Sequence, residues 1–424
     1  MFQVPRRRAR WPWLLSILLL LFVAAGGVFV YGGRAALPRM GVDADRAEPP
    51  ERPPVEVVEA LPALRQALYS RPFTGGVLVA KGDEVLFRQV FGQSEGRPLE
   101  LNSRFRLASV SKQFTAAAIL RLQDDGKLSV DDPLCRFIEP CPPQWAPVRL
   151  WHLLSHTSGV PDIMAQANWG WRRVNPTTLD ELTAYSARYG LQFEPGTKVR
   201  YDNAGYNLLA AVVEKASGQP LADYLRDAFF VPLGMNDTGL DDGSSDHGVI
   251  MGYANLAGGL TPQPKVNPSV IYGAGALYST LDDMFVWTRA LHTGRVLSER
   301  SYAQMIANHA PPPQTPAELA RPPRDWGFGV FVGSLGDRTD QPFHDRQIYH
   351  TGSWSGFRNL VTWEPEQRIA VVVLSNNYHQ GDQVFLLSQQ AMAEALGRPV
   401  PTRADRRGRA YGRQPPAATS PEEG

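Results

Sequence analysis

The segment RNLVTWEPEQRIAVVVLSNN, residues 358–377, predicts a β-hairpin near the C-terminal end of the chain. Two apolar runs flank Glu364-Pro365-Glu366, and such a Pro-containing stretch is typical of a turn between strands. The run 369–374 is apolar at every position, as expected of a central strand covered by helices on both faces. We therefore expect this hairpin to lie inside a sheet.

A second hairpin is predicted near the other end of the chain, where two apolar runs in GGVLVAKGDEVLFRQVFG, residues 75–92, flank Lys81-Gly82-Asp83. Helices are predicted over 55–70, with an interruption at Pro62, and over 382–396. The middle of the chain is largely helical and rich in loops. The fold class is therefore α+β, with an antiparallel sheet built from both chain ends, flanking helices and a mostly helical subdomain beside a cleft.

The stretch SVSK, residues 109–112, is predicted to open a helix that Asp124-Asp125-Gly126 ends. Ser109 and Lys112 are three residues apart and would share a helical face, so the lysine amine can reach the serine hydroxyl. Burial would disfavour the charged lysine and make it a base. Ser109 is thus a candidate nucleophile and Lys112 its base. An ordinary helix start is the alternative, because serine is also favoured there.

Two later triplets favour the nucleophile. Tyr201-Asp202-Asn203 precedes another predicted helix, and His350-Thr351-Gly352 leads into the late hairpin. Ser-x-x-Lys, an x-x-Asn triplet and a basic residue before Thr-Gly, in this order, form the layout of penicillin-recognising serine enzymes. The chain therefore resembles the serine β-lactamase-like superfamily of the class C β-lactamase, D-alanyl-D-alanine carboxypeptidase and esterase type. The resemblance covers about 57–396, including LLSHTSGVPD (153–162), FFVPLGMNDTGL (229–240) and GAGALYS (273–279).

The resemblance implies a role for each motif residue. Ser109 would be acylated, and Lys112 would take or polarise its proton. Tyr201 would act with Lys112 as an acid/base pair, its phenolate favoured by nearby positive charge. Asn203 would hydrogen-bond both substrate and Lys112. The other expected substrate-binding positions are His350, Thr351, Gly352 and Ser353, and the backbone N–H groups of Ser109 and Ser353 would form the oxyanion hole.

Two positions depart from the family pattern. His350 stands where true β-lactamases usually have lysine, and an imidazole is a weaker anchor for a substrate carboxylate. Asp202 is an acid where the family often has a small residue, and it is expected to point to solvent. We therefore expect a serine hydrolase of ester or amide substrates, such as D-amino-acid peptides. The alternatives are a catalytically weak sensor or binding protein and, disfavoured by His350, a true β-lactamase.

Other candidate sites rest on fewer residues. His152 and His156, four apart, would share a helical face, but no third metal ligand lies nearby in the sequence, so a structural role is favoured and neither metal nor cofactor is expected. Cys135 and Cys141 could form a disulfide or remain independent thiols. Trp354, just after the third motif, is the tryptophan best placed to touch substrate, whereas Gly273-Ala274-Gly275 is expected to mark a close backbone approach.

The two ends of the chain differ from the domain between them. An apolar run from Trp11 to Tyr31 follows four arginines, which predicts a membrane anchor within 1–31 with the N-terminus cytoplasmic and the domain outside. A cleaved signal is the alternative. A Pro-rich linker is expected over 32–54, the hydrolase domain over 55–397 and a disordered tail over 398–424. The formal net charge of +1 argues against a nucleic-acid partner.

Overall fold

The computed structural model describes residues 57–58, 60–243, 247–256, 259–264, 266–313 and 324–405. The expected membrane segment (1–31) and linker (32–54) lie outside the described residues, and so do residues 406–424. Among the helices that are described, none has both the length and the apolar character that a membrane crossing requires.

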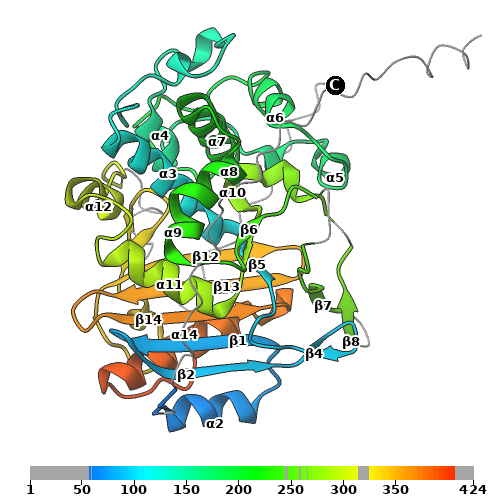
Figure 1. The fold of residues 1–424 in the computed structure, drawn as a ribbon, viewed down its shortest axis with the longest axis vertical. Coiled ribbons are helices and arrows are strands. Elements are labelled where there is room, and N and C mark those ends of the chain that lie inside the picture. Colours follow the sequence, from blue (N-terminus) through cyan, green and yellow to red (C-terminus); the bar gives the residue numbers. More distant parts are fainter. Residues whose placement is uncertain are drawn as a thin grey trace, which may run out of the picture. The chain divides into compact units, whose positions relative to one another are not determined.

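The domain contains a seven-stranded antiparallel sheet in the order β10-β11-β12-β13-β14-β1-β2, of which β12 to β2 are labelled in Figure 1. Both predicted hairpins are present and lie next to each other, because β14 pairs with β1 over its whole length. The sheet is therefore built from both chain ends, as expected. The strand bounds are β1 Gly75–Lys81, β2 Glu84–Phe91, β10 Asp325–Trp326, β11 Phe331–Gly333, β12 Gln347–Trp354, β13 Phe357–Glu364 and β14 Ile369–Ser375.

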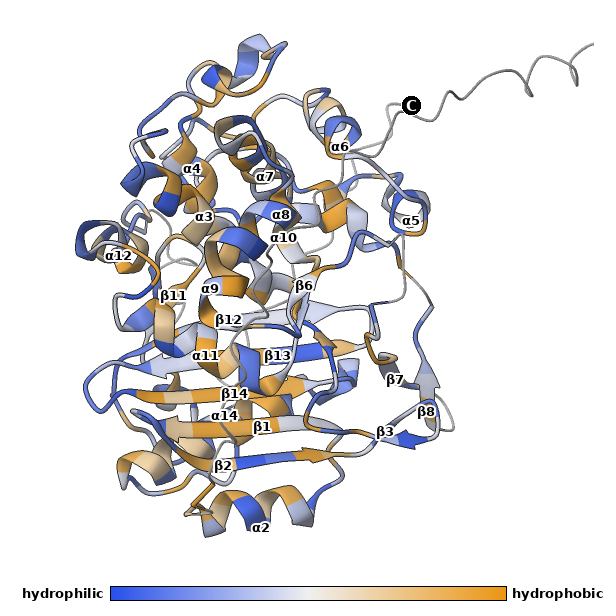
Figure 2. Ribbon diagram, viewed as in Figure 1, coloured by the Kyte–Doolittle hydropathy of each residue, from blue (hydrophilic) through white to orange (hydrophobic). Residues whose placement is uncertain are grey.

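The central strand β14 is buried at every residue. Alternate side chains of a strand point to opposite faces of the sheet, so Ala370, Val372 and Leu374 pack in one core. Ile369, Val371 and Val373 pack in the other. The unbroken apolar run in the sequence thus reflects a strand with a hydrophobic core on each side (Figure 2).

Helices cover both faces of the sheet. The terminal helix α14 (Gly381–Leu396) and α2 (Pro62–Ser70) pack together on one face, and α11 (Leu281–His292) packs on the other (Figure 1). The predicted helix over 55–70 is wrong in its start, because α2 begins at Pro62. Proline lacks an N–H and has a fixed φ, so it suits the first position of a helix rather than its interior.

The middle of the chain forms the expected helical subdomain around α7 (Ala204–Ser217), against which α3, α4, α6 and α10 pack. The described residues also form three small sheets, β3-β4, β5-β9-β6 and β7-β8, that the sequence did not indicate. The remaining bounds are α3 Lys112–Asp124, α4 Leu150–Leu154, α5 Trp169–Arg172, α6 Leu179–Ser186, α8 Leu221–Leu225, α9 Val231–Leu233, α10 Tyr272–Gly275, α12 Glu299–Ile306, β3 Gln93–Ser94, β4 Arg97–Pro98, β5 Phe105–Arg106, β6 Gly239–Leu240, β7 Tyr253–Leu256, β8 Gly259–Pro262 and β9 Leu277–Ser279.

Two local features bear on the predictions. Cys135 and Cys141 are joined by a disulfide with an S–S distance of 2.01 Å. The expected start of a disordered tail at residue 398 is wrong, because residues 398–405 pack on the domain. The Asp340 carboxylate accepts the backbone N–H groups of Thr402 and Arg403, at 2.9 and 3.1 Å, and holds this segment in place.

Candidate active site

The candidate nucleophile lies at the start of the long helix that the sequence predicted. Ser109 belongs to a short 3₁₀ turn, Ala108–Ser111, that runs directly into α3. The preceding residue, Ala108, has a φ of +51°, which is unfavourable for a residue with a side chain and is found most often at functional turns. Ser109 is half-buried, whereas Lys112, one turn later, is fully buried.

Lys112 contacts the candidate nucleophile and two hydrogen-bond acceptors. Its Nζ lies 3.4 Å from Ser109 Oγ. It also donates to Asn203 Oδ1 and to the backbone carbonyl of Ala274, each at 2.8 Å. Burial lowers the pKa of Lys112 to about 7, although the charges of Asp162 and Asp202 oppose this effect. The amine is therefore available in its neutral form near neutral pH.

Two polar groups of this site were not singled out from the sequence. The Ala274 carbonyl reaches Lys112 because the Gly273 Cα lies against α7, where an added Cβ would come 2.2 Å from the Tyr206 carbonyl oxygen. The close backbone approach expected of this glycine segment is therefore confirmed. Asp162, the last residue of LLSHTSGVPD, accepts the backbone N–H of Asn203 at 3.0 Å. Its sequence context resembled the family, but nothing in the pattern assigned it a role.

Tyr201 and Asp202 both differ from their expectations. Lys112 Nζ lies 4.8 Å from the centre of the Tyr201 ring, yet burial raises the pKa of Tyr201 well above its usual range, and Asp162 and Asp202 raise it further. The expected phenolate is therefore wrong, and the phenol keeps its proton. The expectation that Asp202 points to solvent is also wrong, because its side chain is buried and accepts the Gly205 N–H at the start of α7. Burial raises the pKa of Asp202 to about 7.

Strand β12 lies next to the 3₁₀ turn that carries Ser109. Asn359, opposite Gly352 on β13, donates from Nδ2 to the carbonyls of Arg106 and Leu107 at 2.9 and 3.0 Å. These bonds hold the segment before Ser109 against the sheet. Of the predicted substrate-binding residues, Thr351 and Ser353 are exposed on this strand. They can therefore meet a bound molecule.

The close approach of β12 to the backbone of Leu107 requires glycine at residue 352. A Cβ at residue 352 would come 2.2 Å from the Leu107 carbonyl oxygen, which is part of the backbone and cannot rotate away. We expect Gly352→Ala to lower the free energy of unfolding by about 1–3 kcal/mol and to reduce activity by moving β12 away from Ser109. Urea denaturation measures the first effect. Gly190→Ala is the matched control, since nothing lies within 4 Å of that added Cβ, and an equal loss there would contradict the contact.

His350 is buried and neutral. Its Nδ1 lies 2.7 Å from the Thr351 carbonyl oxygen, and its ring stacks on Phe331. Burial lowers the pKa of His350 well below its usual value, and the charge of Lys112 lowers it further. A neutral imidazole at this position has no charge to offer a substrate carboxylate, in line with the weaker anchor expected from the sequence. Arg324 adds to the positive charge around this imidazole, with its guanidinium above the rings of Trp326 and Phe331.

A tryptophan pair lies at the end of β12. Trp354 is 7% exposed and makes an edge contact with Trp169 at 5.8 Å between ring centres. Met164 Sδ lies 3.1 Å from Asn203 Nδ2, and 36% of Met164 is exposed. Met164 thus adds apolar surface beside Asn203.

The two histidines considered for a metal do not share a helical face. Helix α4 ends at Leu154, and His156 follows with a φ of +60°. Nδ1 of His152 accepts the Arg149 N–H at 2.9 Å, and Nδ1 of His156 accepts the Asp202 N–H at 3.3 Å. His156 Nδ1 also lies 3.6 Å from Asp202 Oδ2, but burial lowers the pKa of His156 well below its usual value, so this is no ion pair.

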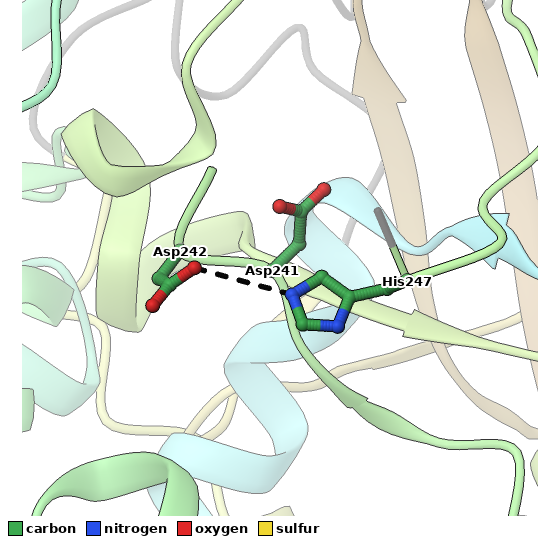
Figure 3. Close-up of side chains that lie close together, drawn as sticks. All are labelled: Asp241, Asp242 and His247. Carbon is green, nitrogen blue, oxygen red and sulfur yellow. Dashed lines mark ion pairs between the residues drawn. The ribbon is translucent and has the colours of Figure 1, made fainter. Parts of the chain in front are cut away.

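Among the described residues, a different group lies close enough together to hold a metal ion, namely Asp241, Asp242 and His247 (Figure 3). Its buried member, Asp241, already pairs with Arg106 at 2.8 Å, three residues before the nucleophile. We therefore assign Asp241 to the support of strand β5. A hollow of about 1060 Å³ beside the start of α14, lined by residues such as Asp340, Asp382 and Arg403, contains none of the active-site residues.

The chain is similar to known proteins over most of its length. A family model described as Beta-lactamase matches residues 64–394. The chain is 32% identical to penicillin-binding protein 4* of Bacillus subtilis (strain 168), over 80% of this chain and 76% of that protein. It is 30% identical to Esterase EstB of Burkholderia gladioli, over 74% of this chain and 89% of the esterase.

A solved structure has the same fold. The octameric penicillin-binding protein homologue from Pyrococcus abyssi superposes with a TM-score of 0.68 and 26% sequence identity, over 80% of this chain and 77% of that one. The antiparallel sheet with its flanking helices and helical subdomain is thus an arrangement that these proteins have in common.

Proposed function

This chain belongs to the beta-lactamase family and is a serine hydrolase of ester or amide substrates, and we propose that it works through an acyl-enzyme on Ser109. The observation that carries the proposal is the placement of Lys112. Its Nζ lies 3.4 Å from Ser109 Oγ, inside a site where burial keeps the amine neutral near pH 7. A neutral amine at this distance can accept the serine proton as the hydroxyl attacks.

In the proposed acylation, Ser109 Oγ bonds to the substrate carbonyl carbon while its proton moves to Lys112 Nζ. The carbonyl oxygen becomes an oxyanion, for which we propose the backbone N–H groups of Ser109 and Ser353 as donors. The bond to the leaving group then breaks, and the leaving oxygen or nitrogen takes a proton from the Tyr201 hydroxyl, which Lys112 replaces. The raised pKa of Tyr201 means that the phenol holds a proton near neutral pH, which this step requires.

In the proposed deacylation, water attacks the same carbonyl carbon and passes its proton back to the Lys112–Tyr201 pair. The bond between Ser109 Oγ and the acyl group breaks, and the serine recovers its proton. The free acid and the regenerated enzyme are the products. Asn203, Thr351 and Ser353 are the proposed contacts to the substrate, and Asn203 also holds Lys112 at 2.8 Å.

We propose esters as the preferred substrates over β-lactams. The neutral, buried His350 offers no positive charge for the carboxylate that β-lactams carry. The experiment compares kcat/KM for p-nitrophenyl acetate and butyrate, D-alanyl p-nitroanilide and nitrocefin. Faster turnover of nitrocefin than of the esters would contradict the ester proposal, and turnover of the anilide alone would assign the enzyme to D-amino-acid amides.

The pH dependence follows from Lys112. Only the neutral amine can accept the serine proton, and the pKa of Lys112 is about 7. We therefore expect kcat/KM to rise with pH, to level off above about pH 7 and to fall about tenfold per unit below it. The measurement uses a neutral ester between about pH 5 and about pH 9, so that the substrate does not titrate. A flat profile would contradict a base of this pKa.

We also propose that the apolar run from Trp11 to Tyr31 anchors the enzyme to a membrane, with the domain outside the cytoplasm. The run and the arginines before it support this proposal. N-terminal sequencing of the membrane fraction tests it, because recovery of a chain that starts after the run would indicate a cleaved signal instead.

A further inference from the structure

Asn203 lies between Lys112 and a carboxylate. Its Oδ1 accepts from Lys112 Nζ at 2.8 Å, and its Nδ2 lies 3.2 Å from Asp162 Oδ1. The two ends of an amide have nearly the same shape, so its partners decide which end faces which way. An ionised carboxylate can only accept. Asp162 therefore selects the NH₂ end of Asn203 and turns the oxygen toward Lys112.

Asp162 is itself held in a fixed position. In addition to Asn203 Nδ2, its Oδ1 accepts the backbone N–H of Asn203 at 3.0 Å and that of Met164 at 3.3 Å. Its side chain is buried, with 7% of the residue exposed. Burial raises the pKa of Asp162 and the charge of Asp202 raises it further, whereas the hydrogen bonds from Asn203 and Met164 lower it.

The orientation of Asn203 matters to the serine. A neutral amine has two N–H bonds and one lone pair. Two fixed acceptors, Asn203 Oδ1 and the Ala274 carbonyl, take the two N–H bonds at 2.8 Å each. The lone pair then remains for the Ser109 hydroxyl at 3.4 Å. A reversed Asn203 would present its NH₂ group to Lys112, and that donor would occupy the lone pair instead.

We propose that Asp162 is a positioning residue of this enzyme, which fixes the amide of Asn203 and, through it, directs the base Lys112 at Ser109. The inference rests on the proposed function, because it assumes that Lys112 activates Ser109. It assigns a role to a residue that does not itself touch the reacting atoms.

The charge of Asp162 gives the inference a measurable signature. Several elements contribute groups around Lys112. They are Ser109, Asp162, Tyr201, Asp202, Tyr206, Ala274 and His350. His156 and Arg324 lie close enough to influence the charge of these side chains. Of these groups, Asp162 and Asp202 favour the protonated amine. Removing the charge of Asp162 therefore lowers the pKa of Lys112, and the neutral amine then persists to lower pH.

The test is Asp162→Asn, which keeps the size of the side chain and one acceptor oxygen. We expect the acid limb of kcat/KM to move down by about one pH unit and the plateau to fall by at least about tenfold, since an amide at residue 162 no longer dictates the orientation of Asn203. The matched control is Asp283→Asn. Asp283 is also buried and accepts from Asp237 N and Thr238 Oγ1 at 2.9 and 2.7 Å, so the acid limb is expected to stay in place.

If the acid limb of the kcat/KM profile does not move in a folded Asp162→Asn enzyme, the inference is overturned. An equal shift of the acid limb in Asp283→Asn also overturns it. If Asp162→Asn does not fold, Asp162→Glu decides. This variant keeps the charge but displaces the carboxylate oxygens. We therefore expect the acid limb of the kcat/KM profile to stay in place and the plateau to fall. A plateau equal to that of the wild type overturns the positioning role. Labelling of the wild type by a fluorophosphonate is measured alongside. Its failure would count against the proposed nucleophile and would thus be distinguished from a failure of Asp162.

Discussion

Replacing Ser109 by alanine is expected to lower kcat/KM for p-nitrophenyl esters by at least about a thousandfold and to abolish covalent labelling. Ser109 supplies the oxygen that bonds to the acyl group, and its hydroxyl lies 3.4 Å from Lys112 Nζ. Alanine removes only that oxygen, so the fold and the remaining site stay in place. The measurement combines ester kinetics with intact mass after incubation with a fluorophosphonate, which adds mass to an activated serine.

The neighbouring serine provides the matched control. Ser111 is buried, and its Oγ accepts the Leu277 N–H at 3.1 Å rather than facing Lys112. Ser111→Ala is therefore expected to lower stability by about 1 kcal/mol while the fluorophosphonate adduct still forms. An adduct on Ser109→Ala equal to that on the wild type would refute the nucleophile, and loss of the adduct in Ser111→Ala alone would move the assignment to Ser111.

The sequence predicted those parts of the fold that depend on local patterns. Strands β1, β2, β13 and β14 followed from apolar runs around turn residues, because such a run fits a strand whatever its partner. The pairing of β14 with β1, residues 369–375 with 75–81, followed only as a general expectation that both chain ends share a sheet. The small strands β5, β6 and β9 were missed because two or three residues carry no periodicity that could be recognised.

The same distinction between local and distant contacts holds for the candidate site. Ser109 and Lys112 could be paired from sequence because helical spacing brings residues three apart together. The Ala274 carbonyl reaches Lys112 from α10, and Asp162 bonds to Asn203 from a loop far away in the chain, and no local rule predicts such contacts. The charge states were also beyond the sequence. Asp202 and His350 are polar side chains that ordinarily face water, and only the packed structure shows that burial raises the pKa of one and lowers that of the other.

Lys112→Arg is expected to lower kcat/KM by at least about a thousandfold at every pH from about 5 to about 9. The reason is that arginine carries a permanent positive charge, whereas a neutral lysine can act as a base. A guanidinium keeps its proton throughout this range, so it cannot accept the proton of Ser109. Kinetics across the pH range measure the loss, and Lys215→Arg, at a position that is exposed on α7, is the control for the chemistry of the substitution.

The two roles that a buried lysine can have predict opposite results for this variant. If Lys112 served only as a positive charge that stabilises the oxyanion, arginine would preserve much of the activity and the acid limb would disappear, because residue 112 would not need to lose a proton. If Lys112 is the base, activity is lost and raising the pH does not restore it. The structure favours the second outcome, because burial lowers the pKa of Lys112 to about 7 and two acceptors take the N–H bonds of the neutral amine. A lysine that served only as a charge would need the opposite environment, one that keeps its ammonium form well above neutral pH.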